Sequence, residues 1–221
     1  MTEKQIWDKI QSLTNNEIFT AALMGNMKAE SALRGNNLQN SYEKKLSYTD
    51  ATYTSAIDQH RYCSDKFCND HAGYGLCQWT HPSRKKNLYN FWLNYDPACS
   101  IGDESMQIEF CIWELRQYGL FDELKKSSSV YDATKIILKK YEKPADQSEE
   151  NVKRRADMAE AFYTAYAKNY PGDSGEFELP LISKSDLMKT LKGLMDQLDC
   201  AQGIMDDCME KIEHVMEELA D

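Results

Sequence analysis

The pattern of apolar and polar positions predicts helices along most of the chain. Apolar side chains recur every three or four positions, which is the period of one helix face. A Thr14–Glu17 capping box is expected to start the second helix. Pro144 is expected to end the helix over residues 130–141. The expected helices cover residues 3–13, 17–30, 82–95, 103–119, 130–141 and 148–166. We therefore expect a mainly helical protein.

The second of these helices carries an acidic residue on its apolar face. Glu30 follows Leu23 by seven positions and Met27 by three, so it shares their face. A carboxyl group on a core-facing stripe is costly to ionise, and one that keeps its proton near neutral pH can act as a general acid. The alternative is a helix-terminal Glu that turns to solvent, as most Glu residues do.

Residues 36–72 are polar and show no sustained helical period. The alternation over residues 53–57 predicts a small β-hairpin or an ordered loop. Long connections of this kind are often functional. The region carries four aspartates, each a candidate for a second active-site carboxylate or for a solvated loop charge: Asp50, Asp58, Asp65 and Asp70.

A glycine-rich motif follows at residues 72–80, with the sequence AGYGLCQWT. Two glycines allow close backbone approach, while Gln78 offers an amide and Trp79 a flat ring. An amide for hydrogen bonding and a ring for stacking suit a sugar ligand. The alternative is a packed helix start with a Trp in the core.

The last forty residues carry a heptad pattern. Apolar positions step alternately by four and three over residues 187–219, which is the a/d seam of a coiled coil. Additional Met residues widen the apolar face and favour a bundle or a higher oligomer. We therefore predict a catalytic domain over residues 1–169, a linker over 170–182 and a coiled-coil oligomerisation helix over 183–221. The alternative is a helix that packs back on the first domain. The seam comprises Leu187, Leu191, Leu194, Leu198, Ala201, Met205, Cys208, Ile212, Val215 and Leu219.

Charge and hydropathy exclude some partners. The formal net charge is −10, and residues 171–221 hold thirteen acidic against four basic side chains. Nucleic acid is therefore not an expected partner, because phosphate binding needs clustered Lys and Arg. No apolar run is long enough to span a membrane, and the first residues lack the features of a signal peptide.

Seven scattered cysteines fit a reducing compartment better than a disulfide framework. The spacing of His60, Cys63, Cys68 and His71 could hold a zinc ion, but it lacks the Cys-x2-Cys pairs of most zinc sites. We favour free thiols or a Cys63–Cys68 bridge, and we expect neither a metal nor a cofactor. Cys77 with a neighbouring His could form a nucleophilic pair, although a Cys in an apolar run is usually inert.

Taken together, these segments resemble the phage tail lysozyme family. The resemblance rests on residues 24–31 (MGNMKAES), the loop over residues 36–50, the motif over residues 73–79 and residues 140–146 (KYEKPAD), and spans about residues 3–168. The motifs are also similar, more distantly, to those of soluble lytic transglycosylases and goose-type lysozymes. Two departures stand out: Cys77 replaces the usual Met, and Glu142 stands where transglycosylases carry Asn.

The resemblance implies a lysozyme-like α+β domain that cleaves the β-1,4 bond between N-acetylmuramic acid and N-acetylglucosamine in peptidoglycan. Glu30 would be the general acid, with Asp70 or, second, Asp50 as the partner carboxylate. The substrate-binding residues that it implies are Tyr48, Tyr74, Gly75, Gln78, Trp79, Tyr141 and Glu142.

Three functions remain open at this point. The chain could be a muramidase, a lytic transglycosylase that forms anhydro-muramic ends, or a non-enzymatic oligomeric wall-binding or scaffold protein. As an enzyme it would act on the cell wall, either as an endolysin held in the host cytoplasm before release or as a lysin carried in the phage virion. The presence of Glu30 together with its candidate partners favours an enzyme.

Overall fold

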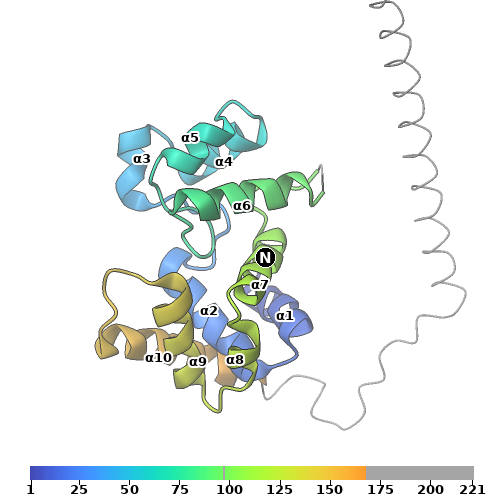
Figure 1. The fold of residues 1–221 in the computed structure, drawn as a ribbon, viewed down its shortest axis with the longest axis vertical. Helices are drawn as coiled ribbons and strands as arrows, with labels where there is room; N and C mark the ends of the chain where they lie inside the picture. Colours follow the sequence, from blue (N-terminus) through green and yellow to red (C-terminus); the bar gives the residue numbers. More distant parts are fainter. Residues whose placement is uncertain (97, 168–221) are drawn as a thin grey trace, which may run out of the picture. The chain divides into compact units, whose positions relative to one another are not determined.

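The computed structural model describes residues 1–96 and 98–167, and over these residues the chain is helical without a β-strand (Figure 1). The predicted linker and coiled coil lie outside the described residues. The helices are α1 (Glu3–Thr14), α2 (Glu17–Ser31), α3 (Asn40–Leu46), α4 (Asp50–Asp58), α5 (Ser64–Asn69), α6 (Pro82–Leu93), α7 (Glu104–Gln117), α8 (Phe121–Lys125), α9 (Val130–Ile136), a π-helical turn η1 (Ile137–Glu142) and α10 (Glu149–Tyr166).

Helix α2 forms the centre of the fold. Every residue from Phe19 to Met27 is buried, so this helix is enclosed on all sides rather than along one stripe. Helices α1, α9 and α10 pack around it. The contact with α10 is close at Gly25, where an added Cβ would lie 2.6 Å from the Cβ of Ala159. A glycine at this position lets α10 approach the helix that carries Glu30.

Helices α3, α4 and α5 gather at one end of the domain beside α6 (Figure 1). The predicted β-hairpin is wrong, because residues 53–57 lie inside α4. A Thr49–Thr52 capping box starts this helix, and Tyr53, Ala56 and Ile57 are buried at helical spacing. Tertiary packing thus overrides the β-propensity of the segment. Extended pairing is limited, among the described residues, to isolated bridges at Tyr74 with Leu38 and with Trp79.

Several predicted helix boundaries are confirmed, and others shift. Helix α10 begins after Ser148, whose side chain caps the backbone of Asn151. The capping box at Thr14 is wrong: Thr14 is the last residue of α1, and Asn16 caps α2 by accepting from the backbone N–H of Phe19. The helical spacing of Met106, Phe110 and Trp113 predicts that all three point inward, but Trp113 of α7 is 39% exposed.

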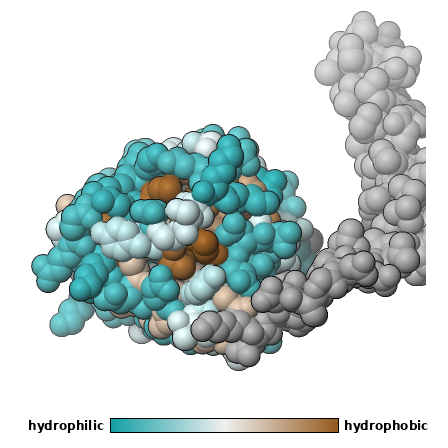
Figure 2. Space-filling model, turned by 90° about the horizontal axis from the view of Figure 1, so that it is seen from below, coloured by the Kyte–Doolittle hydropathy of each residue, from teal (hydrophilic) through white to brown (hydrophobic). Residues whose placement is uncertain are grey.

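The surface is mostly polar on the face shown in Figure 2, with a small hydrophobic area near its centre. Within the described residues, no helix is both long enough and apolar enough to cross a bilayer.

Candidate active site

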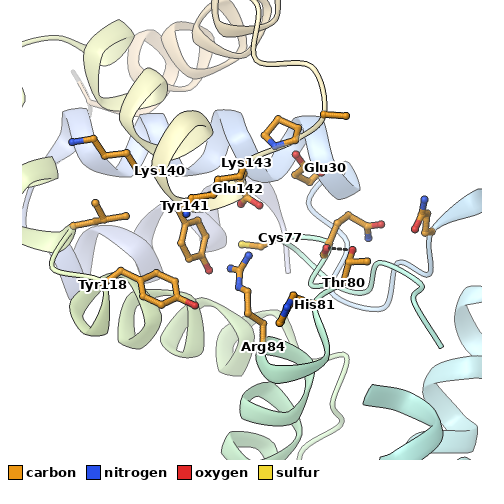
Figure 3. Close-up of a pocket in the computed structure, with 15 residues that line it drawn as sticks. Glu30, Cys77, Thr80, His81, Arg84, Tyr118, Lys140, Tyr141, Glu142 and Lys143 are labelled. Carbon is orange, nitrogen blue, oxygen red and sulfur yellow. Dashed lines mark hydrogen bonds between the residues drawn. The ribbon is translucent and has the colours of Figure 1, made fainter. Parts of the chain in front are cut away.

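A cavity of about 950 Å³ opens beside the end of α2. Most of its walls come from the end of α2, the segment from the glycine-rich motif into α6, and η1 with the residues that follow it (Figure 3). Gln39 and the turn after α7, with Tyr118 and Leu120, complete the lining. A second cavity, of about 470 Å³, shares Glu30, Gln39 and Gln78 with the first. The two cavities therefore adjoin at Glu30.

Glu30 lies in the last turn of α2 with its side chain 18% exposed, and it is ion-paired. Its Oε1 atom accepts a hydrogen bond from Nη2 of Arg155 on α10 at 2.5 Å. Arg155 also donates to Oδ1 of Asn26, one turn earlier on α2, at 3.3 Å. The position on a core-facing stripe therefore comes with a counter-charge, the guanidinium group of Arg155.

Glu142 supplies a second carboxyl group to the larger cavity. It ends the π-helical turn η1, where Lys143 takes a left-handed conformation with φ 50° and Pro144 follows. The Oε1 atom of Glu142 is buried without a hydrogen-bond partner among the described residues. Burial and the nearby charge of Glu30 raise the pKa of Glu142 to about 8. Glu142 therefore holds a proton at neutral pH.

A buried carboxyl group, that of Glu114, holds together several side chains at the cavity wall. Glu114 of α7 is 1% exposed and accepts hydrogen bonds from Nε1 of Trp79 and from the hydroxyl of Tyr141, both at 2.7 Å. Arg84 of α6 donates to both oxygens of Glu114, at 3.0 and 2.7 Å, and its guanidinium lies 4.5 Å from the ring of Tyr141. Figure 3 shows Arg84 pointing from α6 toward Glu142 and Cys77.

The glycine-rich motif forms a tight turn below the cavity. Gly75 has φ 77°, and an added Cβ would lie 2.5 Å from Oε1 of Gln107. That oxygen accepts from the backbone N–H of Leu76 at 2.9 Å. The side-chain amide of Gln78 donates to the backbone oxygen of Asn37 at 3.0 Å. Gln78 lines both cavities. The turn therefore brings an amide, rather than a ring, to the cavity.

Three of the predicted substrate-binding residues are placed at the cavity: Gln78, Tyr141 and Glu142. Trp79 and Tyr74 are fully buried, and the Tyr74 hydroxyl lies 2.8 Å from that of Thr54. Tyr48 packs edge-on against Tyr53 and Tyr62. Trp79, whose ring was expected to stack on a sugar, is therefore a core side chain, as is Tyr74, whereas Tyr48 is half-buried against the core.

Asp70 and Asp50, the candidate second carboxylates, line neither cavity. Asp70 forms a buried ion pair of 2.5 Å with Lys85 and accepts hydrogen bonds from Tyr53 and Tyr62. Asp50 pairs with Arg34 at 2.9 Å and accepts from the backbone N–H of Leu38 at 2.9 Å. Both carboxylates are engaged in holding loops and helix ends together.

The histidine and cysteine candidates are dispersed. The described residues contain no group of three or more His, Cys, Asp or Glu side chains arranged to hold a metal ion. Cys63 and Cys68 are free thiols, so the bridge considered between them is absent. Cys77 is buried with its Sγ 3.7 Å from that of Cys111, and burial raises the pKa of its thiol well above the ordinary value. Such a thiol is a poor nucleophile.

Sequence reasoning missed Arg84, Glu114 and Arg155. Glu114 and Arg155 lie on helix faces that are otherwise buried, which is a detectable signal. Arg84 is half-buried and gives no such signal. Arg155 shares its face with Val152, Ala156 and Ala159, so an unpaired charge there would be costly.

A helical domain with two carboxyl groups in one open cleft has the general design of a glycoside-cleaving enzyme. The family model for phage tail lysozyme matches residues 1–166. The chain therefore belongs to the phage tail lysozyme family, whose members are lysozyme-like and degrade peptidoglycan. This membership associates it with phage and with action on the bacterial cell wall. No curated protein and no solved structure matches the chain significantly.

Proposed function

We propose that the protein is a muramidase that hydrolyses the β-1,4 bond between N-acetylmuramic acid and N-acetylglucosamine. The observation that carries this proposal is the pairing, in one cleft, of an ion-paired Glu30 with a protonated Glu142. Two carboxyl groups whose environments differ in this way provide one proton and one negative charge. Glycoside hydrolysis needs both.

Glu30 stands where the two cavities adjoin, so a glycan strand that occupies both would pass its carboxyl group. In the proposed mechanism, the one proton of the pair is held at rest by Glu142 and passes to Glu30, and Glu30 delivers it to the leaving glycosidic oxygen as the glycosidic bond breaks. The negative charge left on the pair faces the positive charge that develops on the sugar ring. Water then adds to the anomeric carbon and returns one proton to the pair, which restores the enzyme.

A lytic transglycosylase is the second candidate. There the C6 hydroxyl of the muramic residue replaces water, gives its proton to the same pair and leaves a 1,6-anhydro end. Glu142 is the observation that favours hydrolysis, since it supplies a second carboxyl group where transglycosylases carry Asn.

Mass spectrometry of the fragments released from purified peptidoglycan tests the proposal. We expect wild type to release reducing muramic ends, and Glu30→Gln to lower the rate by about 10²–10⁴-fold. Asp50→Asn and Asp70→Asn serve as the comparison for other carboxylates, each judged at equal folded fraction. Anhydro-muramic ends would identify a transglycosylase. Absence of release by wild type would leave a wall-binding or scaffold protein.

We also propose that residues 187–219 form a coiled-coil seam that makes the protein a homo-oligomer. The seam is strict in the sequence, and its Leu and Met residues need a partner surface. Light scattering of the full chain at micromolar concentration tests this. We expect a multiple of the monomer mass that falls for Leu198→Asp, and a monomeric wild type would contradict the proposal.

A further inference from the structure

The two cavities are lined by five Lys and Arg side chains, and four of these form ion pairs with carboxylates. Lys28 pairs with Glu3 at 2.8 Å, and Arg34 pairs with Asp50 at 2.9 Å. In the larger cavity, Arg84 pairs with Glu114 at 2.7 Å and Lys140 with Glu123 at 2.5 Å. The fifth, Lys143, makes no ion pair within the described part of the chain. It is therefore the cation that an anionic ligand in the cleft can engage without breaking a pair.

The backbone around Lys143 is fixed. Its N–H donates to the carbonyl of Leu138 at 2.8 Å, which closes the end of η1. Its left-handed φ of 50° is followed by Pro144, and both residues line the larger cavity. Figure 3 shows Lys143 beside Glu142, at the same opening as Glu30. The side chain of Lys143 is exposed at the rim of the cleft, where a ligand can reach its ammonium group.

We propose that Lys143 binds a carboxylate of the peptide carried by the muramic acid residue, so that the cleft recognises peptide-bearing glycan. The inference rests on the proposed muramidase function. The glycan backbone itself is neutral wherever the lactyl group is joined to peptide, and the acidic residues and end of that peptide supply the carboxylates. A partly exposed ammonium–carboxylate hydrogen bond is charge-assisted and adds to binding more than a neutral bond does.

The test uses two substrates and four proteins. One substrate is peptidoglycan freed of teichoic acid, and the other is the same material with its free carboxylates converted to amides. The proteins are wild type, Lys143→Gln, Lys143→Arg and Lys66→Gln. Lys66 is an exposed lysine of α5 that lines neither cavity, so its variant makes the same charge change elsewhere.

We expect Lys143→Gln to raise KM about tenfold on native peptidoglycan, the size of one charge-assisted hydrogen bond, with kcat little changed. On the amidated substrate, wild type and Lys143→Gln should be equal, because the second partner of the contact is gone. Lys143→Arg should retain most of the preference for the native substrate, and Lys66→Gln should behave as wild type.

The outcomes separate this inference from the function on which it rests. The peptide contact is wrong if wild type cleaves both substrates with the same KM, or if Lys143→Gln raises KM equally on both. Either result leaves the proposed muramidase function intact. If wild type releases no fragments from either substrate, the proposed function fails and this inference fails with it.

Discussion

Nη2 of Arg155 lies 2.5 Å from Oε1 of Glu30, and this contact joins the last described helix to the central one. Arg155 is 4% exposed and donates to Asn26 as well, so two residues one turn apart on α2 share one guanidinium. The contact fixes the direction of the Glu30 carboxyl group. Arg155 acts in our proposal as a positioning residue for the acid.

Replacing Arg155 by Met should therefore lower kcat about tenfold to a hundredfold, because a misplaced catalytic group loses most of the benefit of orientation. Arg155→Lys should recover part of the activity, since it restores the charge but not the two-pronged contact. Lys153→Met, on the exposed side of α10, is the control and should be fully active. Equal activity of Arg155→Met and wild type would remove Arg155 from the mechanism.

The pKa of about 8 at Glu142 predicts an alkaline limit to activity. The protonated form is the active one, so the rate should be constant below this pKa and fall tenfold per pH unit above it. The pH profile of kcat/KM measures this directly. In Glu142→Gln the residual rate should be low and should lack this limb. An unchanged limb in the variant would assign it to another group.

The same shift predicts a stability effect of opposite sign to that of an ordinary carboxylate. The pKa of Glu142 is raised in the folded state, from 4.5 to about 8, so the folded protein binds more protons than the unfolded chain between these values. The free energy of unfolding should therefore decrease as pH rises through this range. Glu142→Gln should remove this loss and be more stable than wild type at pH 9, by on the order of a few kcal/mol, but not at pH 4. Chemical denaturation at the two pH values measures the difference.

Glu114 should be the most sensitive carboxylate of the cleft wall to replacement. Glu114→Gln would leave Arg84 without its charged partner and would disturb the bonds from Trp79 and Tyr141. Breaking a buried ion pair from one side costs about 3–5 kcal/mol of unfolding free energy. Glu109→Gln on the same helix breaks the more exposed pair with Lys9 and should cost less than about 1 kcal/mol. Similar losses for both variants would contradict the assigned role of Glu114.

The sequence was sufficient to predict the helices that carry Glu30 and Arg155. The family motifs also singled out Gln78, Tyr141 and Glu142, which line the cavity. Periodicity and family motifs are local signals, and these residues lie within them. The sequence did not predict that Glu142 would be the second carboxyl group beside Glu30, because the two come together only where η1 packs against α2. Asp70 was favoured instead for its place beside the glycine motif. Its burial against Lys85 depends on α6, and no local pattern reports that contact.

The β-hairpin expected over residues 53–57 failed for a related reason. Thr, Tyr and Ile favour strands on average, but the Thr49 cap and the buried face of Tyr53, Ala56 and Ile57 decide for a helix. The ring of Trp79 suggested sugar stacking, and the family resemblance implied that Tyr74 binds substrate, yet the polar atoms of both side chains are satisfied inside the protein. An aromatic residue beside glycines is thus compatible with either role until its burial is known.

The dependence of Glu30 on Arg155 also has a consequence for the order in which the cleft is completed. Ribosomes release Glu30 early, with α2, whereas α10 emerges after every other helix described here. Until residue 155 has left the ribosome, the acid lacks its guanidinium, and the groove beside Gly25 is uncovered. The lytic cleft is therefore assembled only near the end of this domain's synthesis, so a nascent or prematurely terminated chain carries the acid without the geometry to use it.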